Sequence, residues 1–228
     1  MHADEIAIDD DLVRRLLAEQ FPALAELPLR RAARSGTDHV IYRLGDDLLV
    51  RLARRPSAVA QVETEAEWLP RLAPALPVSV PTPLAVGEPG CGYPNRWSVG
   101  RWLQGEPLSA DPPHDPVALA RDLGAFVRAL RAQDAIGAPR PSRRNAGRGC
   151  PLALRDAATR AALAELERDL DVKAAAAAWD SALTAPMWDR PPVWIHGDLL
   201  AGNLLVRDGR LGAVLDFGCF GAGDPTCD

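Results

Sequence analysis

The sequence has no run of about 18 apolar residues, the length that a membrane-spanning helix requires. It also has no basic leader, because the first residues, Met1-His2-Ala3-Asp4-Glu5, are acidic where a secretory or mitochondrial signal would be positively charged. We therefore expect a cytoplasmic protein that does not bind membranes.

Cysteine is scarce and unpaired in the sequence. The four cysteines, at positions 91, 150, 219 and 227, form no C-x-x-C pair. This spacing favours neither a zinc site nor a disulfide framework, and it predicts reduced thiols.

Positive charge is also limited, since the formal net charge is −5 and the pI is near 5.4. This balance argues against a nucleic-acid partner, which would need a clustered basic face, and it is compatible with a cationic small molecule. Lysine is almost absent: of 26 basic residues only Lys173 is a lysine. Any fixed cationic contact with a phosphate should therefore come from an arginine.

What is present is ordinary globular chemistry. The chain has 228 residues, 47% hydrophobic and 25% charged, which is enough for one large domain or for two lobes with separate cores. Disorder, collagen and coiled coil are excluded.

The first hundred residues predict a small antiparallel sheet with helices. An amphipathic helix should follow the aspartates at 9 to 11 and stop at Pro22. Strands are expected at 27–33, 40–44 and 48–52, separated by turn-like segments, and two more at 83–86 and 97–103. Between them, a helix should open at Ser57 and be bent or ended by Pro70.

Beyond Gly105 the pattern becomes mainly helical. Asp115-Pro116 is typical of a helix start, and an apolar stripe continues to Leu130. A loop rich in Pro, Arg and Gly follows at 137–149, and helices are expected at 152–170 and 172–183. Short strands are expected at 193–195 and 203–206, with Asp208-Gly209 as the hairpin turn before a return strand at 211–217.

The most informative segment is His196-Gly197-Asp198 followed by Asn203 and, after the hairpin, Asp216-Phe217-Gly218. Phosphoryl transfer from a nucleotide needs a carboxylate that orients or deprotonates the attacking hydroxyl, and hard oxygen ligands that hold Mg²⁺ against the phosphates. Asp198 can do the first, and Asn203 with Asp216 can do the second. Taken singly, each residue would more simply be a turn or cap residue, so the joint spacing carries the interpretation.

These segments resemble the aminoglycoside phosphotransferase family of small-molecule kinases. The resemblance includes His196 to Asn203, Leu215 to Gly218, Gly223-Asp224-Pro225 through Asp228, and a region like the family's hinge at Pro94 to Glu106. It implies an α+β, bilobal, protein-kinase-like fold, with an antiparallel sheet and helix in an N-lobe at 1–104 and a mainly helical C-lobe at 105–228. It also implies that the C-lobe is truncated relative to the family, so that the acceptor pocket would be incomplete.

The same resemblance assigns roles to residues of the N-lobe. Ser35, Gly36 and Thr37 fall where the family keeps a loop over the phosphates, although a simple hairpin turn is the alternative. Arg51 takes the place of the kinase lysine that touches the α- and β-phosphates, and Glu65 is the best placed of three nearby glutamates to pair with it. Contacts with the nucleotide base are expected near Ser98, Val99 and Arg101.

Three further sets of residues have simpler roles. His196 is expected to support the catalytic loop rather than to shuttle protons, and Asp224 and Asp228 are expected to order loops through backbone amides or arginines. The arginines at 143, 144 and 148 form a basic loop, for which a solvated surface is the simpler interpretation and contact with phosphate or an acidic substrate the alternative.

The resemblance therefore predicts an enzyme that uses ATP or GTP with Mg²⁺ to phosphorylate a hydroxyl of a small molecule. An aminoglycoside-like, cationic antibiotic is the expected acceptor class. The alternative from a different class is a nucleotide-binding pseudoenzyme or inactive fragment without transferase activity.

Overall fold

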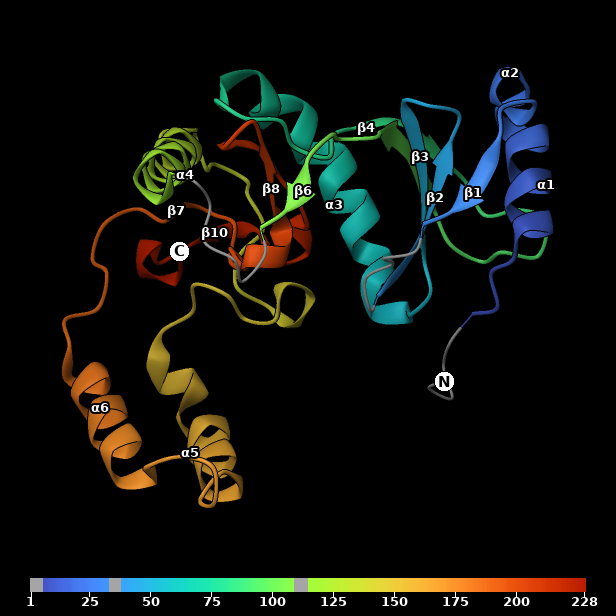
Figure 1. Ribbon diagram of the computed structural model, residues 1–228. Coiled ribbons are helices and arrows are strands. Elements are labelled where there is room, and N and C mark those ends of the chain that lie inside the picture. The colour runs from blue at the N-terminus through green and yellow to red at the C-terminus, as the bar shows by residue number, and fades with distance from the viewer. Residues whose placement is uncertain (1–5, 33–37, 109–114) are drawn as a thin grey trace.

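The computed structural model describes residues 6–32, 38–108 and 115–228. Its architecture is α+β, with an antiparallel sheet in the N-terminal part and helices with two small sheets in the C-terminal part (Figure 1). Within the described residues, no helix is both long and apolar enough to cross a membrane.

The N-terminal sheet has five antiparallel strands in the order β1-β2-β3-β5-β4. All five expected strands are present, with bounds that differ from the predicted ones by a few residues. They are β1 (Leu29–Arg31), β2 (His39–Leu44), β3 (Leu48–Ala53), β4 (Pro83–Gly87) and β5 (Trp97–Arg101).

Two helices cover opposite faces of this sheet (Figure 1). Helix α1 (Asp10–Gln20) starts at Asp9, whose carboxylate accepts a hydrogen bond from Leu12 N at 2.8 Å, and the short helix α2 (Pro22–Ala25) follows it. Side chains on a strand alternate between faces. In β3 this places Val50 and Leu52 in the core with α1, and directs Arg51 to the other face, toward helix α3 (Pro56–Leu72).

Helix α3 (Pro56–Leu72) begins one residue before the predicted start. The helix continues through Pro70 to Leu72, so Pro70 does not end it. A proline prevents the hydrogen bond from its own nitrogen and crowds the preceding turn, so near the C-terminal end it disturbs a helix that is already ending. A short 3₁₀ turn at Ala73–Ala75 completes this segment.

The C-terminal part contains the predicted helices and hairpin and two strands that were not predicted. The elements are β6 (Glu106–Pro107), α4 (Pro116–Arg131), α5 (Asp156–Glu165), α6 (Val172–Thr184), β7 (Val193–Ile195), β8 (Leu204–Arg207), β9 (Arg210–Val214) and β10 (Gly221–Gly223). Strands β6, β8 and β9 form one antiparallel sheet, and β7 pairs with β10 in another. The β8–β9 turn has Asp208 and Gly209 at φ 52° and 75°, as a two-residue hairpin turn requires.

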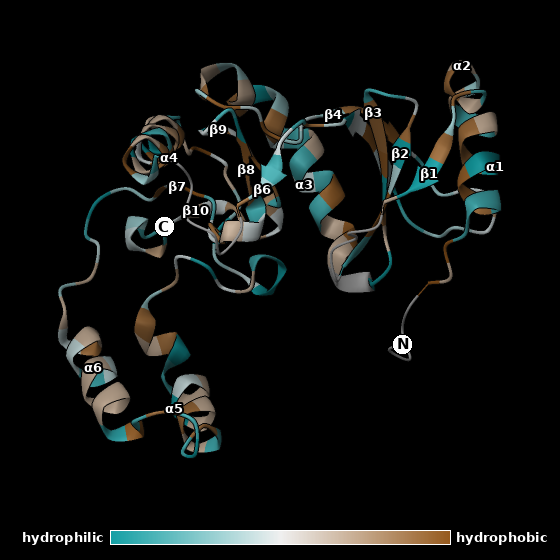
Figure 2. Ribbon diagram, viewed as in Figure 1, coloured by the Kyte–Doolittle hydropathy of each residue, from teal (hydrophilic) through white to brown (hydrophobic). Residues whose placement is uncertain are grey.

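Two hydrophobic cores follow this division. One joins α1 to the five-stranded sheet and includes Trp97 and the brown strand β3 of Figure 2. The other lies around Phe126, Trp194 and Phe217, and it also takes in Trp68 and Leu69 from the C-terminal half of α3. Helix α3 therefore belongs to the second core, and it also contacts the sheet, where Glu65 pairs with Arg51 of β3.

Helices α5 and α6 extend away from the rest of the chain (Figure 1). Neither helix has a buried residue. Two contacts hold them to each other: Arg160 of α5 lies 2.6 Å from Asp180 of α6, and the indole N–H of Trp179 in α6 donates to Asp156 of α5 at 2.7 Å. Arg160 also lies 2.8 Å from Asp156 in its own helix.

Candidate active site

The His196 to Asn203 segment forms a tight loop between β7 and β8, at the boundary of the two parts. Gly197 has φ 80°, and a Cβ at this position would lie 2.8 Å from the carbonyl oxygen of Cys219. Both conditions favour glycine, because other residues rarely adopt this backbone conformation and a side chain would clash with neighbouring backbone. The glycine between His196 and Asp198 is therefore a requirement of this loop.

His196 supports the loop from within the core, as predicted. It is buried, and its ring packs edge-on against Phe217 with centroids 4.6 Å apart. Its Nε2 lies 2.9 Å from the carbonyl oxygen of Leu215, while Nδ1 accepts the backbone N–H of Asp198 at 3.2 Å. Burial lowers the pKa of His196, so the neutral ring is the form that fits these two contacts.

Asp228 anchors the same loop through its backbone, as predicted for an ordering carboxylate. Its two oxygens accept the backbone N–H groups of His196 and Gly197, each at 2.7 Å. Asp224 has the other expected role, since its carboxylate accepts the backbone N–H and the hydroxyl of Thr226 at 2.9 and 2.7 Å. Both aspartates thus stabilise local backbone.

The carboxylate of Asp198 is held by two neighbours. Asn203 Nδ2 donates to the Asp198 carbonyl oxygen at 2.9 Å and to its Oδ2 at 3.2 Å, and Arg148 Nη2 lies 3.4 Å from its Oδ1. Arg148 comes from the basic loop after α4, which therefore is not a purely solvated surface. The side chain of Asp198 remains 23% exposed, so a reacting group can reach it.

Asp216 follows β9 and has a left-handed backbone conformation, with φ 59° and ψ 72°. Its Oδ1 accepts the N–H of Gly218 at 3.3 Å and the Nε2 of Gln61 at 3.1 Å. This backbone conformation is uncommon for residues other than glycine, and it persists only where the surrounding structure holds the residue in place.

The Asp198 and Asp216 segments lie side by side. Leu215 N donates to the carbonyl oxygen of Asn203 at 2.7 Å, which joins the two strands of the hairpin at this level. Burial is the main cause that raises the pKa of the nearby Cys219 thiol; Arg148 opposes the shift, and the carboxylates of Asp198 and Asp216 both add to it. Because Leu204 of β8 pairs with Val214 of β9, the hairpin places the Asn203 end of one strand beside the Asp216 end of the other.

Arg51 and Glu65 form the expected ion pair between β3 and α3. Arg51 Nη1 lies 2.5 Å from Glu65 Oε2, and the Glu65 side chain is only 2% exposed. Gln61 Nε2 donates to the other oxygen of Glu65 at 2.8 Å as well as to Asp216. A continuous chain of contacts thus runs from β3 through α3 to Asp216.

The structure places the other predicted nucleotide contacts as follows. Ser98 and Val99 are buried in β5, which is hydrogen-bonded to β3 on one side and β4 on the other, and Arg101 ends this strand exposed. The chain leaves the sheet at Trp102, whose N–H donates to Asp47 O at 2.8 Å. Ser35, Gly36 and Thr37 lie outside the described residues.

The donor set fits Mg²⁺ better than a softer metal. Asn203 uses its Nδ2 toward Asp198, which directs its Oδ1 away from that carboxylate, and Asp216 supplies carboxylate oxygens. These are the hard oxygen donors that Mg²⁺ prefers together with nucleotide phosphates. In the described part of the chain, no group of three His, Cys, Asp or Glu side chains is arranged to hold a metal.

Two residues of this cluster, Gln61 and His39, were not identified from the sequence, and Arg148 was named only as part of a basic loop. Gln61 bridges Glu65 and Asp216, Arg148 contacts Asp198, and His39 Nδ1 lies 3.3 Å from Arg51 Nη2. Helical spacing of four residues between Gln61 and Glu65 was the only sequence signal for the first. The roles of Arg148 and His39 depend on contacts between segments that are distant in the sequence, and no local sequence pattern predicts such contacts.

A sequence-profile comparison matches residues 30–228 to the family described as "Phosphotransferase enzyme family". Comparison with curated protein sequences yields no match.

Similar solved structures include phosphotransferases of two antibiotic classes. A GDP complex of aminoglycoside 2′-phosphotransferase-IIIa superposes with a TM-score of 0.74 at 22% identity, over 96% of this chain and 75% of that one. A streptomycin–ATP ternary complex of APH(2″)-IIa superposes with a TM-score of 0.65 at 22% identity, over 98% of this chain and 75% of that one. The macrolide 2′-phosphotransferase MphH from Brachybacterium faecium superposes with a TM-score of 0.63 at 28% identity, over 96% of this chain and 76% of that one. The fold is thus kinase-like, as predicted.

Proposed function

Because the chain belongs to the phosphotransferase enzyme family, we propose that it transfers the γ-phosphate of ATP or GTP to a hydroxyl group of a small molecule in a Mg²⁺-dependent reaction. The single observation that carries this proposal is the arrangement of Asp198, Asn203 and Asp216 around one loop and one hairpin.

Asp198 is the proposed catalytic residue. Its carboxylate receives the proton of the acceptor hydroxyl as the new bond between that oxygen and the γ-phosphorus forms, while the bond to the bridging oxygen of the nucleoside diphosphate breaks. Asn203 and Arg148 hold the carboxylate in place from two sides, which reduces the number of orientations it can take.

Asn203 and Asp216 are the proposed metal ligands, through their side-chain oxygens. A bound Mg²⁺ would neutralise charge on the phosphates. Gln61 donates to Asp216 Oδ1 and so orients the carboxylate from the α3 side.

Arg51 is proposed to contact the α- and β-phosphates in place of a lysine. Its guanidinium has donors left after Nη1 binds Glu65, and a planar fork can hold phosphate oxygens in pairs. Ser35, Gly36 and Thr37 remain proposed as the loop over the phosphates, and Ser98, Val99 and Arg101 as the strand that leads to the base site.

For the acceptor we propose an aminoglycoside-like antibiotic, in a protein that acts in the cytoplasm. The net charge of −5 suits a cationic acceptor. The similarity to a macrolide phosphotransferase supports testing macrolides beside aminoglycosides.

The test of this proposal is transfer of radiolabelled phosphate to a panel of aminoglycosides and macrolides, with Mg-ATP and Mg-GTP in separate reactions. Asp198→Ala should lower the rate by about 10²-fold or more, because a positioned base is lost. The matched control is Asp208→Asn, at a turn residue whose side chain is 90% exposed, and it should keep the wild-type rate.

Equal rates in Asp198→Ala and wild type would refute the assignment of Asp198. Binding of nucleotide with no product from any acceptor would instead favour a nucleotide-binding module without transferase activity. Nucleotide binding is measured separately as a rise in melting temperature on addition of Mg-nucleotide.

A further inference from the structure

His39 is a buried polar side chain on the face of the N-terminal sheet that α3 covers. Val40 and Tyr42 of β2 belong to the core shared with α1, so the alternation of side chains along a strand directs His39 to the opposite face. His39 is only 5% exposed. Buried polar side chains are normally hydrogen-bonded, and the partner of this ring therefore indicates its role.

The partner of His39 is the guanidinium of Arg51 on the neighbouring strand β3. His39 Nδ1 lies 3.3 Å from Arg51 Nη2. A guanidinium has only N–H donors and no acceptor, so Nδ1 accepts this hydrogen bond and the proton of the neutral ring is on Nε2. Burial and, after it, the charge of Arg51 lower the pKa of His39 to about 2. His39 is thus a neutral acceptor for Arg51 at neutral pH.

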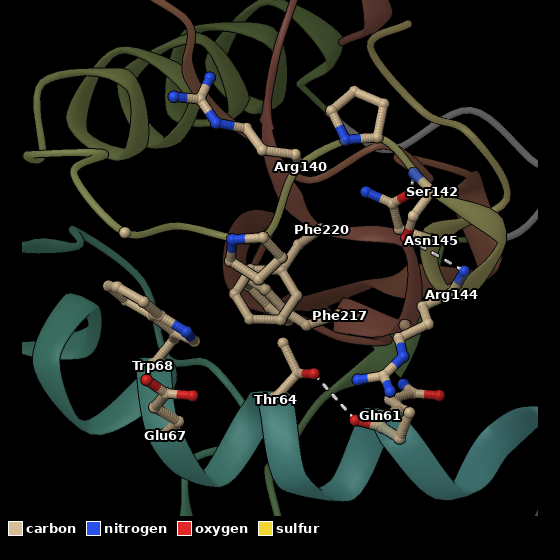
Figure 3. Close-up of a pocket in the computed structure, with 15 residues that line it drawn as sticks. Gln61, Thr64, Glu67, Trp68, Arg140, Ser142, Arg144, Asn145, Phe217 and Phe220 are labelled. Atoms are coloured by element: carbon tan, nitrogen blue, oxygen red, sulfur yellow. Dashed lines mark hydrogen bonds between the residues drawn. The ribbon is translucent and has the colours of Figure 1, made fainter.

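Glu65 holds only one of the two terminal nitrogens of Arg51. Its Oε2 lies 2.5 Å from Arg51 Nη1, and its Oε1 accepts from Gln61 Nε2 at 2.8 Å. Gln61 lies one turn earlier on α3, on the wall that this helix gives to a pocket facing the 137–145 loop (Figure 3). Because Gln61 occupies Oε1, Glu65 does not bind the guanidinium through both oxygens, as a paired arginine–carboxylate contact would require. Nη2 therefore depends on His39.

Two acceptors from different elements thus hold the Arg51 guanidinium. Glu65 holds Nη1 from α3, and His39 holds Nη2 from β2. A guanidinium held at one nitrogen can still pivot about that contact, and a second contact fixes the direction of its plane. The Arg51 side chain is 12% exposed, so part of it stays accessible. The N–H groups that do not bind Glu65 or His39 then point in a fixed direction.

We propose that His39 is a positioning residue, which orients Arg51 toward the α- and β-phosphates by accepting a hydrogen bond from Nη2. This assignment rests on the proposed function, in which Arg51 contacts the nucleotide. The buried ring does not touch the phosphates and acts only through Arg51. Because a donor that is already held in place loses less conformational freedom when a ligand binds, His39 raises the affinity for Mg-nucleotide.

The test is binding of Mg-ADP and Mg-GDP to the full chain, measured by isothermal titration calorimetry without an acceptor substrate. His39→Phe keeps a planar ring but removes the acceptor, and it should weaken binding by about fivefold or more. His39→Asn should restore the affinity to within about twofold of wild type, because an amide oxygen can accept from Nη2 in place of Nδ1. Tyr42→Phe is the matched control: it removes a buried hydroxyl from the same strand, on the face toward α1, and should leave the affinity unchanged.

The effect of His39 should also depend on Arg51. In an Arg51→Lys background the single terminal nitrogen pairs with Glu65, so adding His39→Phe should change the Kd by less than about twofold. Melting curves without nucleotide show whether each variant is folded. If His39→Phe does not fold, His39→Leu removes the acceptor with a smaller side chain, and the same loss of affinity is expected.

Three results would overturn the positioning role while wild-type binding shows that the nucleotide site exists. These are equal Mg-nucleotide affinity of His39→Phe and wild type, failure of His39→Asn to restore binding, and an undiminished loss in the Arg51→Lys background. Absence of binding of either Mg-nucleotide to the wild-type chain at about 10 mM would instead refute the proposed function, and the positioning role with it.

Discussion

Replacing Glu65 by glutamine removes the charge at the centre of the contact chain between β3 and Asp216. The carboxylate accepts from Arg51 at 2.5 Å and from Gln61 at 2.8 Å, and the two charged side chains are 2% and 12% exposed. Glutamine keeps the volume and one oxygen, but its NH₂ group faces a donor. Glu65→Gln therefore leaves Arg51 partly buried without its counter-charge.

The loss of stability expected for Glu65→Gln follows from the burial of the Arg51–Glu65 ion pair. Breaking a buried ion pair by altering one partner costs about 3 to 5 kcal/mol, and retention of one hydrogen bond reduces this to about 2 to 3 kcal/mol. For a chain of this length 1 kcal/mol corresponds to about 2 to 4 °C, so the melting temperature should fall by about 5 to 10 °C. Urea unfolding followed by circular dichroism measures the free energy of unfolding directly.

Glu63→Gln is the matched control, since Glu63 is an exposed glutamate on the same helix. It should change the free energy of unfolding by less than about 0.5 kcal/mol. A double-mutant cycle of Glu65→Gln with Arg51→Met should give a coupling of at least about 1 kcal/mol. The reasoning is refuted if Glu65→Gln lowers the free energy of unfolding no more than Glu63→Gln does. It is also refuted if the cycle shows no coupling between Glu65 and Arg51.

Two further predictions concern stability. Gly223→Ala should lower the free energy of unfolding by about 1 to 3 kcal/mol, because the added Cβ would lie 2.8 Å from Gly149 Cα. Gly202→Ala is the control and should change it little, because a Cβ there has nothing within 4 Å. Equal losses of the two variants in urea unfolding would contradict this prediction. Burial and, after it, Arg51 lower the pKa of His39 from 6.5 to about 2. Between pH 7 and pH 5, His39 is therefore protonated in the unfolded chain and stays neutral in the folded protein. This difference should lower the free energy of unfolding by about 2 kcal/mol over that range. His39→Gln should remove that part of the slope, and an unchanged slope would refute the assignment.

Local patterns predicted most of the fold. Alternating apolar residues located the five strands of the N-terminal sheet, and Asp9 and Asp115 marked the starts of α1 and α4. These features depend on neighbours in sequence, where periodicity and capping act. Strands β6 and β10 were missed because they are two and three residues long and exist only through pairing with β8 and β7.

The candidate site divides in the same way. Asp198, Asn203 and Asp216 lie within 18 positions of one another, so the turn and hairpin predicted their proximity. The contact of Arg148 with Asp198 spans 50 residues and that of Gln61 with Asp216 spans 155. Such contacts depend on how α3 packs between the sheet and the second core, and no local sequence pattern determines that packing.

The central claim is that Asn203 and Asp216 hold one divalent metal against a nucleotide beside Asp198. Electron paramagnetic resonance titration with Mn²⁺ in place of Mg²⁺, in the presence of a non-hydrolysable ATP or GTP analogue, measures the metal affinity directly. We predict tight binding by the wild-type chain, a loss of about tenfold or more in Asp216→Ala and in Asn203→Ala, and no loss in Asp208→Asn. Equal Mn²⁺ affinity in all four proteins would contradict the account.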